Sequence, residues 1–349
     1  MTTTVSVEYE YSVDLPLLLD KLNISLLLST YQAGQVVSIG TFQGQLQVSF
    51  SHFQQAMGVT RTSSGIAIGC QQNVWSLPAN RAIASRLPPE EQHDIAFLAR
   101  SCHQTGPLMI HDLAWAGDQL WLVNTLFNCL VTVDQHWSFV PQWKPPFIDE
   151  ITPEDRCHLN GVAIAEDGSA PLWATALAAT NEDQGWREQK ATGGCLLHVP
   201  SGDLALQGLC MPHSPRLHQE QLYLLNSGQG TLVQVDSSRG EARSVAQLPG
   251  FTRGLDCYAG HAFVGLSQIR ETAVFGDLPL QESNQELRCG VAMVDLSSGN
   301  VEGMLWFRSG VEEVFAVTVL PGYRNPVVIG PDTQTDHTKT IWLVPPQDS

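Results

Sequence analysis

QLWLVNTLFNCLVTVD, residues 119–134, and QLYLLNSGQGTLVQVD, residues 221–236, are two copies of one pattern. Each copy has an apolar segment ending in Asn-Thr or Asn-Ser, a short polar turn, and a second segment of the form Leu-Val-x-Val. SLLLSTYQAGQVVSIG, residues 25–40, resembles both. Short runs rich in β-branched residues on either side of a turn predict a two-stranded hairpin.

Looser copies of the hairpin recur along the chain at intervals of about 40 to 60 residues. They lie at residues 66–77, 172–202, 262–299 and 326–346, which brings the count to seven. Helical periodicity is confined to residues 15–22 and a weaker segment at 89–97. Repetition at this period, with 29 glycines for the turns, predicts an all-β fold of the β-propeller type.

In a propeller, the innermost strand of each blade comes before its hairpin. Six segments fit that position, and they start at Met57, His111, Asn160, His213, Arg253 and Glu313. Seven hairpins favour seven blades, but the first hairpin lacks an obvious inner strand, so six blades remain the alternative. The strand VSVEYEYS, residues 5–12, is expected to close the ring against the last blade. Residues 1–349 are then a single β-propeller domain.

Composition narrows the class of protein. The net charge of −17 argues against a nucleic-acid partner, because phosphate binding needs clustered Lys and Arg. No run of eighteen apolar residues and no signal-peptide pattern occurs, which predicts no membrane association and a cytoplasmic location. No P-loop or GxGxxG motif is present, so no nucleotide cofactor is expected. The eight cysteines include no CxxC pair.

The starts of the inner strands carry unusually polar residues. Inner strands all run in the same direction, so their first residues should meet at one mouth of the central channel. Imidazole and carboxylate groups are common ligands of catalytic metals, which predicts a site for a divalent ion such as Fe, Zn, Mn or Cu. The predicted metal ligands are His111, His158, His213 and Glu313.

Other roles follow from side-chain chemistry at the same mouth. The predicted catalytic groups are His111, His158, Glu313 and Asp112, and Arg253 is predicted to bind an anionic group of the substrate through its planar fork. Asn160 and Trp143 are predicted to contact the substrate as well. The alternative is that these polar side chains only bind water and backbone, as is common in propeller channels.

Long loops are expected on the face where the inner strands start. They comprise residues 178–194, 270–289 and 331–339, together with the connection 142–158. Loops that gather on one face of a rigid scaffold are where binding sites are usually built. These segments therefore support a site at that mouth.

Several rare sequence words occur in order along the chain: LSTYQAG, HDLAW, WKPPFI, PEDRCHLNGVA, MPHSPR and LPGF. They resemble an uncharacterised bacterial family of conserved hypothetical β-propeller proteins, a resemblance that covers nearly the whole chain and implies a fold but no activity.

A second, local resemblance links HLNGVAIAEDGSAPLWATA, residues 158–176, to gluconolactonase-type propellers. It implies that Asn160 binds a divalent metal. Leu159 stands where that pattern has proline, and His213 where its next blade has aspartate.

The sequence thus predicts a propeller enzyme that acts on a small anionic molecule at a histidine-rich site. Hydrolysis of a lactone or ester is the leading reaction, and metal-dependent oxidation is the next. Two further hypotheses involve no catalysis: a propeller that binds a peptide or protein on the same face, and a sensor of a small ligand.

Overall fold

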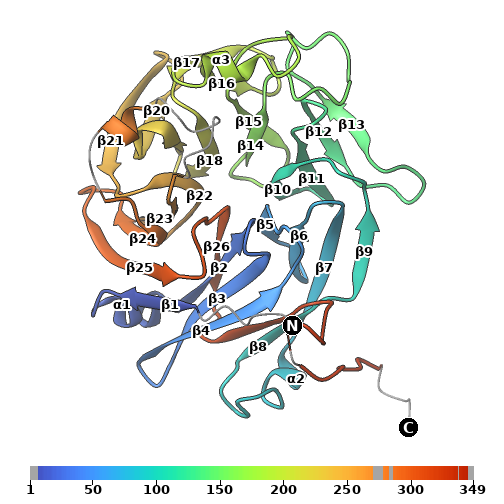
Figure 1. Ribbon diagram of the computed structural model, residues 1–349, viewed down its shortest axis with the longest axis vertical. Coiled ribbons are helices and arrows are strands. Elements are labelled where there is room, and N and C mark those ends of the chain that lie inside the picture. Colours follow the sequence, from blue (N-terminus) through green and yellow to red (C-terminus); the bar gives the residue numbers. More distant parts are fainter. Residues whose placement is uncertain (1–6, 270–277, 283–285, 337, 345–349) are drawn as a thin grey trace.

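The computed structural model describes residues 7–269, 278–282, 286–336 and 338–344, which form a β-propeller of six blades around a central channel (Figure 1). Blades 1 to 6 follow the order of their inner strands around the ring, beginning with the blade whose inner strand lies nearest the C-terminus of the chain. The inner strands contact one another in this circular order: β26 (Ala316–Pro321), β5 (Val59–Arg61), β10 (Ile110–Ala116), β14 (Leu159–Ile164), β18 (Pro212–His218) and β22 (Phe251–Tyr258). Within each blade, neighbouring strands pair antiparallel from the inner strand outward, apart from one parallel pair at the rim of blade 2.

Blades 3, 4 and 5 are regular, four-stranded sheets in which the chain runs from the channel to the rim. Their strands are β10 (Ile110–Ala116), β11 (Gln119–Asn124), β12 (Cys129–Thr132) and β13 (Val140–Trp143); β14 (Leu159–Ile164), β15 (Pro171–Ala176), β16 (Gly194–His198) and β17 (Leu204–Leu209); and β18 (Pro212–His218), β19 (Gln221–Asn226), β20 (Thr231–Asp236) and β21 (Glu241–Gln247). The two copies of the sequence pattern are the central hairpins β11–β12 and β19–β20. The hairpin prediction is therefore confirmed.

Blades 2 and 6 carry additional strands. Blade 2 contains β5 (Val59–Arg61), β6 (Gly65–Gly69), β7 (Asn73–Asn80), β8 (Ile95–Leu98), β9 (Ser101–Gln104) and β27 (Pro326–Ile329). Blade 6 contains β22 (Phe251–Tyr258), β23 (His261–Ser267), β24 (Cys289–Asp295), β25 (Val301–Ser309) and β1 (Glu8–Tyr11).

Blade 1 closes the ring by joining the two ends of the chain. Its inner strand is the C-terminal β26 (Ala316–Pro321), which pairs with β2 (Ile24–Thr30), and β3 (Gln35–Phe42) and β4 (Gln45–His52) complete the sheet. An N-terminal strand does close the ring, as expected, but it is β2. The segment 5–12 contributes β1, which is the fifth and outermost strand of blade 6.

The preference for seven blades is corrected to six, the alternative that the sequence left open. All six predicted inner-strand segments are inner strands, and the segment that starts at Glu313 supplies the one that the first hairpin lacked. The seventh hairpin, at 326–346, is not a blade. Its first half is β27, which pairs in parallel with β8 at the rim of blade 2.

Helices are few and short. The predicted helix at 15–22 is confirmed as α1 (Leu15–Leu22), which packs its leucines against blades 1 and 6. The segment 89–97 is not helical and leads into β8. The remaining helices in the described part of the chain are α2 (Arg81–Ala84), α3 (Trp186–Gln189), α4 (Pro279–Glu282) and the 3₁₀ turn η1 (Ser227–Gln229). None of these helices has the length and apolar character needed to cross a bilayer.

Ring closure should depend on apolar packing between the chain ends. Leu28 of β2 is fully buried, lies opposite Val317 of β26, and packs in a cluster that includes Leu15 and Leu19. We expect Leu28→Ala to lower the free energy of unfolding by about 2–5 kcal/mol, because the cavity left in a packed core cannot fully collapse. Urea denaturation measures this change.

The matched control is Leu17→Ala on α1, since the Leu17 side chain is 69% exposed. It should change the free energy of unfolding by less than about 0.5 kcal/mol. Equal effects of the two substitutions would contradict the closure described here.

Candidate active site

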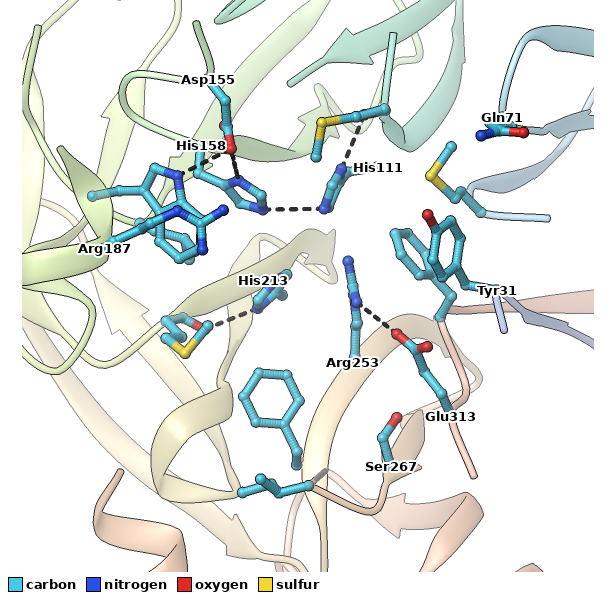
Figure 2. Close-up of a pocket in the computed structure, with 18 of the residues that line it drawn as sticks. Tyr31, Gln71, His111, Asp155, His158, Arg187, His213, Arg253, Ser267 and Glu313 are labelled. Carbon is cyan, nitrogen blue, oxygen red and sulfur yellow. Dashed lines mark hydrogen bonds and ion pairs between the residues drawn. The ribbon is translucent and has the colours of Figure 1, made fainter. Parts of the chain in front are cut away.

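A cavity of about 420 Å³ lies at the channel mouth where the inner strands begin (Figure 2). Five of the six predicted strand starts line it: Met57, His111, His213, Arg253 and Glu313. His158, two residues before the sixth start, lines it as well. These groups therefore lie together at one mouth of the channel, as strand direction predicted.

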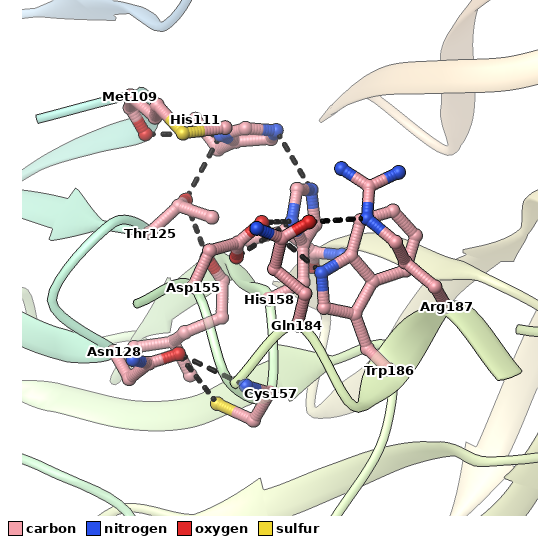
Figure 3. Close-up of polar contacts among 12 residues, drawn as sticks. Met109, His111, Thr125, Asn128, Asp155, Cys157, His158, Gln184, Trp186 and Arg187 are labelled. Atoms are coloured by element: carbon pink, nitrogen blue, oxygen red, sulfur yellow. Dashed lines mark hydrogen bonds and ion pairs between the residues drawn. The ribbon is translucent and has the colours of Figure 1, made fainter. Parts of the chain in front are cut away.

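His111 is held at the start of β10 by its Nδ1 atom. Nδ1 lies 2.9 Å from the carbonyl oxygen of Met109 and 2.9 Å from Oγ1 of Thr125 (Figure 3). The Thr125 hydroxyl donates its own proton to the carbonyl of Leu159 at 2.6 Å. Both neighbours of Nδ1 therefore act as acceptors, so Nδ1 carries the imidazole proton and Nε2 faces the cavity with a lone pair.

His213 repeats this arrangement in blade 5. Its Nδ1 lies 2.9 Å from the Met211 carbonyl oxygen and 2.9 Å from Oγ of Ser227. Thr125 and Ser227 are the hydroxyl residues that end the first strand of the repeated sequence pattern. The hairpin repeat thus supplies the same support for a histidine in each of two blades.

His158 is anchored by a carboxylate instead. Its Nδ1 lies 2.9 Å and 3.0 Å from the two carboxylate oxygens of Asp155, and the indole Nε1 of Trp186 donates to Asp155 Oδ2 at 3.0 Å (Figure 3). The Trp186 ring also packs against the imidazole, with ring centroids 4.5 Å apart. A carboxylate on Nδ1 fixes the tautomer and raises the basicity of Nε2.

The backbone around these groups is strained. The non-glycine residues with left-handed φ angles there include Met109 (55°), Asp155 (48°), His158 (51°) and Met211 (51°). Such conformations cost about 1–3 kcal/mol each and concentrate at functional sites. Here they turn the two methionine carbonyls and the Asp155 carboxylate toward imidazole Nδ1 atoms.

His111 and His158 meet through their other nitrogens, with 3.1 Å between the two Nε2 atoms. Because both Nδ1 atoms are donors, two neutral rings would direct two lone pairs at each other. A shared proton or a bound cation between the Nε2 atoms removes that repulsion. The pair is therefore suited to proton transfer or to ligation of a metal.

Burial keeps the imidazoles of His111 and His213 uncharged. It lowers the pKa of His111 well below 6.5, and the neighbouring His158 and Arg253 lower the pKa further. Burial and then Arg253 and His158 lower the pKa of His213 in the same way. His111 and His213 are consequently hydrogen-bond acceptors at Nε2 at neutral pH.

Arg253 is the buried cation of the site. Its side chain is 10% exposed, its Nη1 donates to Glu313 Oε1 at 3.0 Å, and its guanidinium lies 3.4 Å from the ring centroid of Phe315. Burial lowers the pKa of Arg253 to about 10, against the opposing effect of Glu313. Arg253 therefore stays charged at neutral pH, beside the imidazoles (Figure 2).

The four predicted metal ligands are not gathered into one coordination sphere. Glu313 pairs with Arg253, and only His111 and His158 meet directly. Within the described ranges, the one set of three His, Cys, Asp or Glu side chains with ligand atoms within 4.8 Å of one another is His261, Asp295 and Glu302 in blade 6. The residues of the pocket offer a metal two close ligands rather than four.

Three predicted site residues lie outside the pocket. Asp112 follows His111 on the strand and points away, so its carboxylate binds Arg216 at 2.9 and 3.1 Å and joins blade 3 to blade 5. Asn160 donates to the Pro212 carbonyl and accepts from Thr175, so its amide is held between strands and does not line the cavity where the implied metal would bind. Trp143 lies at the rim in β13 and packs between blades 3 and 4.

Two residues of the site were not predicted. Asp155 precedes His158 by three residues in PEDRCH, a spacing that could have indicated a carboxylate partner for the imidazole. Trp186 belongs to the predicted loop 178–194, which does reach the mouth with Trp186 and Arg187. In the segment 270–289, residues 270–277 and 283–285 lie outside the described residues, and no described residue of 331–339 lines the cavity.

The fold and the cavity define a six-bladed β-propeller with a histidine-lined pocket at one mouth of its channel. The chain belongs to the family described as Domain of unknown function (DUF4915), which matches residues 13–329. Comparison with the curated proteins gave no match.

Solved structures of similar fold include a chain of a nidogen/laminin complex, with 9% sequence identity, a TM-score of 0.52, and coverage of 86% of this chain and 98% of that chain. A protein of unknown function from Bacteroides caccae is similar with 10% identity, a TM-score of 0.50, and coverage of 85% and 98%. At this level of identity the likeness establishes the fold alone.

The lowered pKa values of His111 and His213 make stability depend on pH. The unfolded chain binds protons at these residues as pH falls through 6.5, whereas the folded chain does not, so the free energy of unfolding should decrease below pH 6.5. Each histidine adds up to about 1.4 kcal/mol per pH unit to this slope. Urea denaturation between pH 7.5 and 5 measures it.

The variant His111→Asn/His213→Asn should have a shallower slope, because each Asn amide can still donate to the methionine carbonyl but does not titrate. The neighbouring charged groups Arg253, Glu313 and Asp155 are unchanged in this variant. An identical slope in variant and wild type would show that neither imidazole is buried in its neutral form.

Proposed function

We propose that the pocket is the active site of an enzyme that acts on a small anionic molecule, and that it hydrolyses a lactone or ester. The observation that carries the proposal is the hydrogen-bonded chain Asp155–His158–His111, which ends in a cavity that also holds the buried cation Arg253. A carboxylate-supported imidazole facing a cavity is the usual arrangement of a general base.

The proposed reaction assigns one step to each group. His158 takes a proton from water at Nε2, and Asp155 stabilises the imidazolium that forms. The water oxygen bonds to the acyl carbon, whose oxygen becomes negative and is stabilised by Arg253. The acyl carbon–oxygen bond then breaks, and the proton passes through His111 to the leaving oxygen. The carboxylic acid product releases a proton to solvent.

The cavity suits a small substrate. Its volume of about 420 Å³ lies within the range of small-molecule pockets. Many of its lining side chains are apolar, among them Met57, Phe251 and Trp186, so water can be excluded once a ligand is bound. A peptide or protein partner would use an exposed surface and would leave the Nε2 atoms of the buried histidines without a role.

A divalent metal is the second candidate, and one observation favours it. All three histidines are anchored at Nδ1 and unprotonated at Nε2, the state in which imidazole ligates a metal. With a cation between them, His111 and His158 would supply two ligands, and the ion would act as a Lewis acid or support oxidation. Of the predicted metals, Fe, Zn and Cu suit imidazole ligands, whereas Mn prefers oxygen ligands.

A cytoplasmic location is proposed on separate grounds. All eight cysteines are free in the structure, and most of them are buried. Free thiols in this number suit a reducing compartment.

The hydrolase proposal predicts the effect of removing the base. His158→Ala should lower kcat/KM for the best substrate of a panel of lactones and esters by about 10²–10⁴-fold, because general-base catalysis is lost. Asp155→Asn should lower kcat, since the imidazolium loses its carboxylate partner. A pH-stat assay of acid release measures both.

The control is His136→Ala, which removes a histidine whose side chain is 83% exposed and which does not line the cavity. It should leave turnover unchanged. Full activity of a folded His158→Ala variant would refute the proposed base. Ligand binding without any turnover by the wild type would instead identify a sensor.

The metal proposal predicts a metal content that depends on the pocket. Elemental analysis of purified protein should give stoichiometric metal in the wild type and a loss of it in His111→Ala/His213→Ala. His261→Ala, in the other histidine-containing cluster, is the control and should retain the pocket metal. Metal-free wild-type protein whose stability does not change with chelator would exclude this candidate.

A further inference from the structure

The cation in the pocket has an unused hydrogen-bond donor. Arg253 Nη1 is bound to Glu313, but Nε is buried and has no hydrogen-bond partner among the residues that the structure describes. A buried donor without a partner is costly and rare in folded proteins. Because the Arg253 side chain lines the cavity and its guanidinium is nine-tenths buried against Phe315, the ligand group that best fits it is a negatively charged oxygen.

The imidazole of His213 requires a ligand group that donates a hydrogen bond. His213 uses Nδ1 on Met211 and Ser227, and its Nε2 has no hydrogen-bond partner in the described part of the chain. An unprotonated Nε2 is an acceptor, and a hydroxyl is a ligand group that donates to an acceptor without bringing a charge. His213 and Arg253 line the same small cavity (Figure 2), so one small ligand can reach both.

Most of the remaining wall is apolar, although Gln71, Arg187, Ser267 and Gln268 also line the cavity. The apolar part is formed by methionine, aromatic and aliphatic side chains, including Met57, Met109, Met211, Leu177, Phe251 and Ile269. A ligand with many hydroxyls would lose hydration against these surfaces without gaining hydrogen bonds, at a cost for each hydroxyl. The body of the ligand should therefore be a hydrocarbon chain or an aryl ring.

We propose that the pocket binds a hydroxy carboxylic acid with an apolar or aryl body, its carboxylate on Arg253 and its hydroxyl on His213. The hydroxyl is the former leaving oxygen, which receives its proton through His111 and then donates it in a hydrogen bond to His213 Nε2. The inference rests on the proposed function, because hydrolysis of a lactone converts one ring ester and one water into one hydroxyl, one carboxylate and one proton. The substrate is then an alkyl- or aryl-substituted lactone, and the hydroxy acid is its product.

Direct binding tests this inference without turnover. The probes are 5-hydroxydecanoate and 4-hydroxy-4-phenylbutanoate, each paired with the acid that lacks the hydroxyl, decanoate and 4-phenylbutanoate. Gluconate is the polyol acid for comparison. Isothermal titration calorimetry at pH 7.5 should give Kd values for at least one hydroxy acid about tenfold below those of its deoxy partner and of gluconate.

Two variants assign the contacts. Arg253→Met should weaken binding of the hydroxy acid by at least about tenfold, and Arg253→Lys should restore part of it, because the charge returns without the fork. His213→Phe should abolish the preference for the hydroxy acid over the deoxy acid while leaving the deoxy acid's Kd unchanged. Thermal unfolding of each variant establishes that it is folded.

The outcomes separate the two proposals. Tight binding of the hydroxy acids without hydrolysis of any lactone or ester would support the ligand class and overturn the hydrolase. Hydrolysis by a protein that binds gluconate as tightly as the apolar hydroxy acids would support the hydrolase and overturn the ligand class. Absence of binding by any probe would overturn the ligand class, as would an Arg253→Met variant that binds as the wild type does.

Discussion

The pairing of β26 with β2 is the constraint on which the pocket depends. It joins the last inner strand of the ring to the first hairpin of the chain and so fixes all six inner strands side by side around the channel. Six strands in one orientation place their first residues at one mouth, although these residues are spread over most of the sequence. No local segment could bring His111, His213 and Arg253 together without that closure.

Within the ring, the histidines are aimed by a recurrent local device. A residue with left-handed φ, two positions before the histidine, turns its carbonyl onto Nδ1, as Met109 does for His111 and Met211 does for His213. The same device occurs at Ala259 and His261, in the β22–β23 turn of blade 6, where Nε2 meets Glu302 instead of the cavity. The device only fixes the tautomer. What makes two of the three imidazoles part of a pocket is their place at the channel mouth.

The sequence contained most of the fold and part of the site. Hairpin periodicity and strand direction were enough to place the inner strands and to bring His111, His158, His213, Arg253 and Glu313 to one mouth. The preference for seven blades was wrong because the inner strand of blade 1 comes from the opposite end of the chain, which no local pattern reveals. Asp112 lies outside the cavity for a simpler reason. Neighbouring residues of a strand point to opposite sides, so His111 and Asp112 cannot both face the cavity. Asn160 and Trp143 make contacts between blades instead of lining the cavity, and such contacts depend on the full tertiary structure.

The charges in the pocket, together with burial, explain why His111 and His213 are uncharged at neutral pH. Arg253 brings one positive charge into a buried space with two carboxylates, Asp155 and Glu313, while Arg187 stays exposed at the rim. Charging all three imidazoles would leave an excess of positive charge that burial does not tolerate. In the proposed reaction, the proton that His158 takes from water lies between the two Nε2 atoms, where it offsets the charge of the remaining carboxylate and removes their lone-pair repulsion. A single mobile proton held between two bases beside a fixed cation is the electrostatic condition for general acid–base chemistry in this pocket.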